Sequence, residues 1–198
     1  MAIAMVKTRD KLIEVARLLF ARIGVENTTM NDIAAASQKG RRTLYTYFKS
    51  KTDIYHAVVE SELNILYTAL ETVVDKEMPA DEKLLEFIRT RSDMIKQVVF
   101  RNGTLKARFF RDIWQVENVR KGFDLQEINY IQAILDEGVR KNSFVIEDTA
   151  SMAAILHYAF KGLEVPYIRG TMKGIRSGSK DMENIVNLLF NGIKKKNL

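Results

Sequence analysis

The chain has 198 residues, of which 46% are hydrophobic, and it contains two prolines and no cysteine. This size allows a buried core in one or two domains, whereas the lack of cysteine excludes disulfides, a thiolate nucleophile and cysteine metal sites. The net charge of +6 is concentrated in residues 1–55, which hold ten basic and five acidic side chains, while the rest is almost balanced. Such an asymmetry is typical of a phosphate-binding module attached to a neutral one.

The hydropathy of the chain gives no sign of a membrane segment. No apolar run approaches the roughly 18–20 residues that span a bilayer, and the stretch Met1–Met5 is too short for a signal peptide. Extended alternating stretches are few, and apolar residues recur mainly at helical spacing. We therefore expect an all-α cytoplasmic protein with no membrane partner.

The first predicted helix runs from Thr8, as its N-cap, to Ile23. Its apolar residues recur at helical spacing, and Gly24 supplies a stop signal. The broad apolar face predicts that this helix packs under the two that follow, as the third member of a small bundle.

Residues 28–51 read TTMNDIAAASQKGRRTLYTYFKSK and predict a helix-turn-helix. Thr29 and Asp32 have the spacing of a capping box, so a helix should begin there. The polar run 37–40 interrupts it, and a third helix follows over 41–48. Its apolar residues share one face at i, i+4, which leaves arginine, threonine and tyrosine side chains available to a partner.

Ser50 and Asp53 repeat the capping-box spacing and predict a fourth helix, whose pattern continues to about Glu77 and stops before Pro79. Further helices are expected from Asp81 to Asn102, around Leu105–Trp114 with an end before Gly122, and from Leu125 to about Lys141. The last two are expected over Thr149–Ile168, with a kink or stop at Pro166, and over Asp181–Lys196.

Wide apolar faces near the end of the chain have little later sequence to cover them, so a second copy of the protein is a natural cover. The alternative is that both last helices close the core of the monomer. The candidate dimer residues are Leu156, Phe160, Leu163, Tyr167, Ile185, Leu188, Leu189 and Ile193.

Aromatic and sulfur-containing side chains in the second part of the chain suit the lining of a site for a small, largely apolar effector. Arg91 and His157 are the candidates for orienting such a ligand, although a hydrogen-bonded core role for His157 is an open alternative. The apolar candidates, which could equally be core residues, are Phe87, Met94, Phe109, Phe110, Ile113, Trp114, Tyr130 and Tyr158.

Nothing in the sequence selects an enzyme. The two histidines, His56 and His157, are far apart, and there is neither a glycine-rich phosphate loop nor a metal motif of the HExxH type. We therefore expect no catalytic residues, no cofactor and no metal. A dimeric DNA-binding regulator or architectural protein without an effector is the closer alternative.

The segments Thr28–Ala34 and Thr43–Lys51 resemble the DNA-binding signature of the tetracycline-repressor (TetR) family, over about residues 8–55. The resemblance implies a homodimeric transcriptional regulator, most often a repressor, with a nine-helix fold. It implies a helix-turn-helix domain over 1–50 that binds a double-stranded, palindromic operator. Residues 51–198 would hold the effector and form the dimer through the last two helices.

The candidate DNA contacts divide into base-reading and phosphate-binding residues, because arginine pairs with guanine whereas lysine and tyrosine mostly hold phosphates. Thr29 belongs to the same predicted surface. For both tyrosines the alternative is that the rings are core and only the hydroxyls reach solvent. We assign base reading to Arg41, Arg42, Thr43 and Tyr45, and phosphate contacts to Thr28, Lys39, Tyr47 and Lys51.

The turn departs from the family pattern, in which glycine is usual at position 38, serine at 40 and glycine at 42. If the turn geometry is kept, Gln38 must adopt a backbone conformation that glycine tolerates more cheaply. Gly40 can cap the third helix only without a side-chain oxygen. Lys39 and Arg42 add positive charge.

Overall fold

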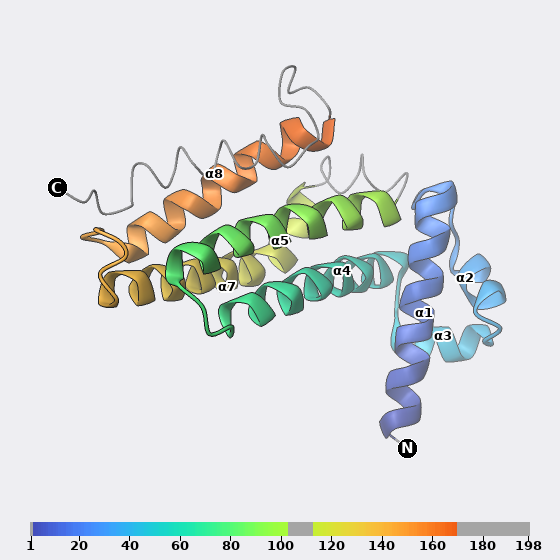
Figure 1. Cartoon of the computed structure of the whole chain (residues 1–198). Helices are drawn as coiled ribbons and strands as arrows, with labels where there is room; N and C mark the ends of the chain where they lie inside the picture. Colours follow the sequence, from blue (N-terminus) through green and yellow to red (C-terminus); the bar gives the residue numbers. More distant parts are fainter. Residues whose placement is uncertain (1, 103–112, 170–198) are drawn as a thin grey trace. The chain divides into compact units, whose positions relative to one another are not determined.

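The computed structural model describes residues 2–102 and 113–169, with side chains described for residues 6–98, 100–102 and 121–162. The secondary structure in these ranges is α-helical, as predicted. Nine helices were expected for the whole chain, and the described residues contain seven. They are α1 (Ala2–Ile23), α2 (Met30–Ala36), α3 (Arg41–Tyr47), α4 (Lys51–Val74), α5 (Ala80–Arg101), α7 (Ile113–Arg140) and α8 (Thr149–Arg169) (Figure 1).

The chain divides into two compact units. Unit 1 contains Met1–Ile65 and Gln97–Arg120, and unit 2 contains Leu66–Lys96 and Lys121–Leu198. Helices α4, α5 and α7 therefore each contribute residues to both units. The predicted DNA-binding domain, residues 1–50, lies within unit 1.

The core of unit 1 is built from the apolar faces of its helices. Residues spaced three and four apart on α1 are buried, because side chains at these positions lie on one side of a helix. The ring of Phe20 meets that of Tyr55 edge to face, with centroids 6.2 Å apart. The buried apolar residues of unit 1 include Leu12, Ile13, Ala16, Phe20, Val25, Ile33, Ala34, Leu44, Phe48, Ile54, Tyr55 and Val58.

Unit 1 also contains a buried polar contact between three helices. Arg17 of α1 donates to the carbonyl oxygen of Arg101 at 3.0 Å and pairs with Glu14 at 2.6 Å. Asn102, which follows α5, donates to Glu62 of α4 at 2.9 Å. Arg17, Glu62 and Asn102 are all almost fully buried. These bonds compensate charges that would otherwise be costly to bury.

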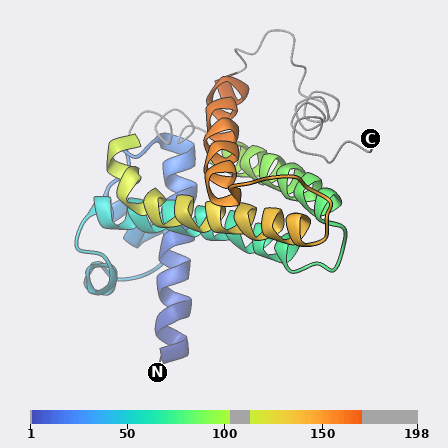
Figure 2. The same ribbon diagram turned by 90° about the vertical axis from the view of Figure 1, so that its left-hand side faces the viewer.

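Unit 2 contains the later part of α4, most of α5 and α7, and α8. In both views α8 turns back from the C-terminal end of α7 (Figures 1 and 2). Tyr67 of α4 stacks on Phe123 of α7, with ring centroids 4.8 Å apart. The buried apolar residues include Leu70, Val73, Leu84, Phe87, Ile88, Ile131, Ile134, Leu135, Phe144, Ala153, Leu156 and Phe160.

A close contact shapes the turn after α7. Asn142 adopts a left-handed conformation with φ of 56°, and the backbone N–H groups of Ser143 and Phe144 donate to the carbonyl of Gly138 at 2.8 and 3.2 Å. A Cβ atom on Gly138 would lie 2.1 Å from Cδ2 of Phe144. The glycine is therefore required by packing.

Two predicted helix boundaries are wrong. Helix α1 begins at Ala2, not after Thr8, because none of the intervening residues is a helix breaker. Helix α7 continues through Gly122, since an isolated glycine weakens a helix without ending it. Helix α8 ends at Arg169, one residue beyond its predicted end, and Pro166 does not stop it. The helices expected over 105–112 and 181–196 lie outside the described residues.

The predicted stop at Gly24 is confirmed, because this residue has a φ of 87° and follows the last residue of α1. In the parts of the chain with assigned helices, none is both long and apolar enough to cross a bilayer.

Candidate nucleic-acid interface

The start of α2 is fixed by the predicted capping box. Thr29 Oγ1 accepts a hydrogen bond from the N–H of Asp32 at 3.2 Å, and the carboxylate of Asp32 accepts one from the N–H of Thr29 at 2.8 Å. The Thr29 hydroxyl also donates to this carboxylate at 2.7 Å, and this bond is the main reason why the pKa of Asp32 is lowered. Thr29 is exposed at the N-terminal end of α2.

The turn between α2 and α3 has the geometry expected from its departure from the family pattern. Gln38 adopts a left-handed backbone with φ of 56°, which confirms that it takes a conformation glycine tolerates more cheaply. Ser37 is buried, and its hydroxyl donates to the carbonyl of Ala34 at 3.0 Å. The N–H of Lys39 reaches the same carbonyl at 3.1 Å. Backbone bonds thus hold the turn despite its non-glycine residue.

Helix α3 has one buried and one open face. Gly40 is its N-cap and gives no side-chain hydrogen bond, as expected. Leu44 and Phe48 are buried and anchor the helix to the core. Tyr45 is 44% exposed, which argues against a core role for its ring. Arg41, Arg42 and Thr46 are also exposed, whereas Lys39, Thr43 and Tyr47 are half-buried.

A second capping box begins α4, again as predicted. Ser50 Oγ accepts a hydrogen bond from the N–H of Asp53 at 3.1 Å, and the Asp53 carboxylate accepts from the N–H groups of Ser50 and Lys49 at 3.1 and 2.9 Å. The pKa of Asp53 is lowered mainly by the side-chain hydrogen bond with Ser50. The loop that leaves α3 is thus fixed to the first turn of α4.

Lys51 and Thr28 serve the fold in a way the sequence did not reveal. Lys51 Nζ donates to the carbonyl oxygens of Val25 at 2.7 Å, Glu26 at 3.2 Å and Thr28 at 2.9 Å. An ammonium group has three N–H donors, so all of them are directed at the loop between α1 and α2. The predicted phosphate contact of Lys51 would require these bonds to break.

Thr28 is fully buried, and its hydroxyl donates to the carbonyl of Gly24 at 2.7 Å. The predicted phosphate contact of Thr28 would require this turn to open, because no part of the residue is accessible in the structure. The Thr28 hydroxyl has a local structural role, since it closes the turn that follows α1.

The two polar effector candidates in unit 2 converge on a residue that the sequence analysis missed. Glu127 Oε1 lies 2.7 Å from Arg91 Nε and 3.1 Å from His157 Nδ1, and Tyr67 donates its hydroxyl to Glu127 Oε2 at 3.4 Å. Burial alone would raise the pKa of Glu127, but Arg91 and His157 outweigh it, so this pKa is lowered. The one signal for Glu127 in the sequence is that a carboxylate stands within an apolar helical pattern.

The remaining effector candidates do not share one environment. Phe87 is fully buried in the core, Met94 and Tyr130 are half-buried, and Tyr158 is 62% exposed. Tyr130 accepts a hydrogen bond from Gln126 at 2.7 Å. Side chains outside the described residues include those of Phe109, Phe110, Ile113 and Trp114.

Two of the predicted dimer residues are part of the protomer's own core. Leu156 and Phe160 are buried, and the guanidinium of Arg91 lies 5.9 Å from the centroid of the Phe160 ring. The face of α8 that carries them packs within unit 2, so these two side chains are not open to a second subunit in the protomer. Ile155, 61% exposed, and Tyr158 are open instead. The other candidates lie outside the described side chains: Leu163, Tyr167, Ile185, Leu188, Leu189 and Ile193.

Comparisons with known proteins agree with this geometry. Residues 12–58 match the sequence model of "Bacterial regulatory proteins, tetR family". The chain is 30% identical to the HTH-type transcriptional regulator SAB2452 of Staphylococcus aureus over 129 residues, which are 61% of this chain and 68% of that protein.

Solved structures share the fold at lower identity. A TetR-family transcriptional regulator from Pectobacterium atrosepticum has a TM-score of 0.75 at 18% identity, covering 99% of this chain and 98% of its own. The SmeT–triclosan complex has a TM-score of 0.67 at 16% identity, covering 96% and 93%.

Proposed function

Because the chain belongs to the tetR family of bacterial regulatory proteins, and is thus a DNA-binding transcriptional regulator, we propose that it is a dimeric repressor. Helix α3 enters the major groove of a palindromic operator, and a small, largely apolar effector bound in unit 2 causes release. The observation that carries the DNA-binding part is the division of α3 into an anchored face and an open face with Arg41, Arg42 and Tyr45.

The roles on α3 follow from side-chain chemistry. An arginine donates two parallel hydrogen bonds to guanine, the commonest specific contact in the major groove. Arg41 and Arg42 stand in the first turn, and the N-terminal residues of a recognition helix are those that meet base edges. Tyr45 and Thr43 complete the base-reading set, while Lys39 and Tyr47 contact phosphates. A phosphate contact of the exposed Thr29 requires its hydroxyl to leave the Asp32 carboxylate.

Dimerisation places two copies of α3 on two half-sites. Such half-sites lie about 34 Å apart, one helical turn of DNA, or a multiple of this spacing. The exposed Ile155 and Tyr158 of α8 support a subunit contact on this side of the helix, because large apolar side chains on an open helix face favour a partner. A two-fold axis between the subunits would match a palindromic operator.

The effector is supported by the similarity of fold to a complex with triclosan, a small apolar molecule. In this chain Arg91 and His157 already bind Glu127, so a ligand that uses either group must compete with a buried carboxylate. The same observation favours the second candidate function, a DNA-binding regulator or architectural protein without an effector. Release depends on the difference in effector affinity between the two states of the protein.

The DNA-binding part is tested by selecting bound duplexes from a random pool and titrating the best one with variants. Arg41→Ala should weaken binding by about 1–3 kcal/mol and relax the preference at one base step. Arg140→Ala, which removes an exposed arginine of α7, should bind as the parent does. Equal affinity and base preference in Arg41→Ala and the parent would refute the role of α3. A selected sequence without two-fold symmetry would refute the palindromic operator.

The effector is tested separately with the same selected duplex. Triclosan and a panel of other lipophilic compounds are titrated into the protein–DNA complex, and bound compound is detected by native mass spectrometry. We expect at least one compound to bind the protein and release the DNA. If none binds and the complex persists, the protein acts without an effector of this class.

A further inference from the structure

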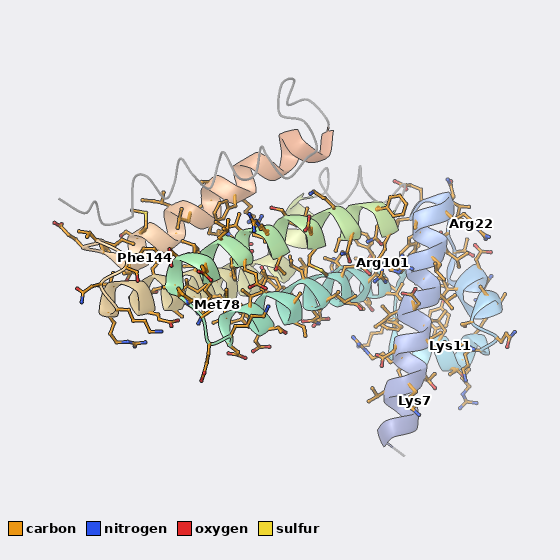
Figure 3. All side chains as sticks on the ribbon, in the orientation of Figure 1. Lys7, Lys11, Arg22, Met78, Arg101 and Phe144 are labelled. Carbon is orange, nitrogen blue, oxygen red and sulfur yellow. The ribbon has the colours of Figure 1, made fainter. Side chains whose placement is uncertain are left out.

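The N-terminal part of α1 carries positive charge outside the helix-turn-helix. Because α1 begins at Ala2, Lys7, Arg9 and Lys11 stand within regular helix and not in a preceding arm. Figure 3 labels Lys7 and Lys11 on this part of α1. All three cations are exposed. Residues 7–11 contain one acidic residue, Asp10, so the segment has a net charge of +2.

Arg9 differs from the two lysines in its surroundings. Its guanidinium carbon lies 5.6 Å from the centroid of the Phe48 ring, the geometry of a cation–π contact. Phe48 is buried and is the C-cap of α3. The contact therefore holds Arg9 at the C-terminal end of α3. Among the described side chains, no carboxylate forms an ion pair with Arg9.

The dimensions of α3 and of the groove determine what Arg9 would meet. Seven residues of α-helix are about 10 Å long, and the major groove is about 12 Å wide. A helix that enters this groove from its N-terminal turn thus has its other end near a rim, where the sugar-phosphate strand runs. A guanidinium at that end can bind a phosphate oxygen with two N–H groups.

We propose that Arg9 binds an operator phosphate and forms an additional contact, supplied by α1, beside the helix-turn-helix. This inference rests on the proposed entry of α3 into the major groove. The Phe48 ring orients the guanidinium before DNA arrives, so less side-chain freedom is lost on binding. Arg9 contributes to affinity for every sequence and not to the choice of bases.

Lys11 provides the matched control. Residues two positions apart point about 200° apart around a helix, so Lys11 faces away from the side on which Arg9 meets Phe48. Replacing either residue removes one positive charge from the same two turns of α1. A general effect of net charge would be equal in both variants, whereas a direct phosphate contact belongs to Arg9 alone.

The test measures the affinity of the full chain for its selected duplex across a series of salt concentrations. Each neutralised phosphate contributes about 0.9 to the slope of log K against log [salt]. Arg9→Met, which keeps an apolar cover on Phe48, should lower the slope by about 0.9 per subunit. Arg9→Lys should keep the parent slope, because it retains the charge, and Lys11→Met should also keep it. Thermal unfolding of the same variants reports any loss of packing on Phe48.

The outcomes separate this inference from the proposed function. A parent slope in Arg9→Met, with or without a lower Tm, would overturn the phosphate contact and leave a packing role. An equal drop in Lys11→Met would assign the effect to net charge and overturn it as well. If Arg41→Ala weakens binding while Arg9→Met does not, only the inference fails. If the parent selects no duplex, the proposed function fails with it.

Discussion

Lys51 Nζ lies 2.9 Å from the carbonyl oxygen of Thr28, so the first turn of α4 is bonded to the residue that precedes the cap of α2. Lys51→Met removes this bond and two others to neighbouring carbonyls. We expect a loss of about 1–3 kcal/mol in the free energy of unfolding, measured with denaturant, because hydrogen bonds from charged groups are among the stronger ones. The exposed Lys49 provides a control, since Lys49→Met should change stability by less than about 0.5 kcal/mol.

Lys51→Met also separates two roles for this lysine. If Lys51 serves the fold alone, the folded variant keeps the salt slope of DNA binding. A slope reduced by about 0.9, without a change in stability, would restore the phosphate contact suggested by the sequence.

Gln38 carries the backbone strain of the helix-turn-helix. The left-handed backbone of Gln38 destabilises the folded state by about 1–2 kcal/mol relative to glycine. Glycine itself lowers stability by up to about 1 kcal/mol, because it gives the unfolded chain more conformational freedom. Gln38→Gly should therefore raise the free energy of unfolding by up to about 2 kcal/mol. Gln38→Ala keeps the strain and should bring no such gain. An equal gain in both variants, measured by denaturant unfolding, would show that the side chain and not the backbone is responsible.

Two glycines of α7 should respond to alanine in opposite directions. A Cβ atom on Gly138 would meet the ring of Phe144, whereas one on Gly122 would meet nothing within 4 Å. Gly138→Ala should lower the free energy of unfolding by about 1–3 kcal/mol through overpacking. Gly122→Ala should raise it by about 1 kcal/mol through helix propensity. The free energy of unfolding of both variants is measured by thermal and denaturant unfolding. A change in the same direction in both would contradict this prediction.

Glu127 should make unit 2 sensitive to acid. Its pKa is lowered in the folded protein, so its charged form stabilises the fold above the unfolded pKa of about 4.3, and this contribution is lost as the pH falls through the folded pKa. Glu127→Gln should lose about 3–5 kcal/mol at pH 7, because Arg91 would be left without its carboxylate. Its stability should then fall less steeply than that of the parent below about pH 4.3. Parallel curves for the two proteins would show that Glu127 does not titrate there.

The parts of this fold that depend on neighbouring residues could be predicted from the sequence. The capping boxes of Thr29 with Asp32 and of Ser50 with Asp53 join residues three apart, so their spacing alone indicates the helix starts. The positive φ of Gln38 followed from a turn geometry that usually takes glycine. The exposed face of α3 followed from the spacing of Leu44 and Phe48.

The failures concern contacts between residues distant in the sequence. Lys51 reaches carbonyls at least 23 residues away, and Glu127 collects partners from α4, α5 and α8. No periodicity encodes such pairs. Apolar spacing on α8 also identifies a buried face, but it does not tell whether the protomer or a second subunit covers that face.

The bonds of Arg17, Glu62 and Asn102 restrict how this chain can evolve. Replacing Glu62 alone leaves the buried Arg17 with one carboxylate fewer nearby. Replacing Asn102 alone removes the 2.9 Å hydrogen bond to Glu62 and leaves this carboxylate with Arg101 at 3.3 Å and Arg17 at 3.8 Å. Each single step is thus selected against, although a concerted change to apolar residues of similar volume can be neutral. In related proteins we expect residues 17, 62 and 102 to change together. Substitutions in α1, in α4 and after α5 should therefore be correlated at these positions.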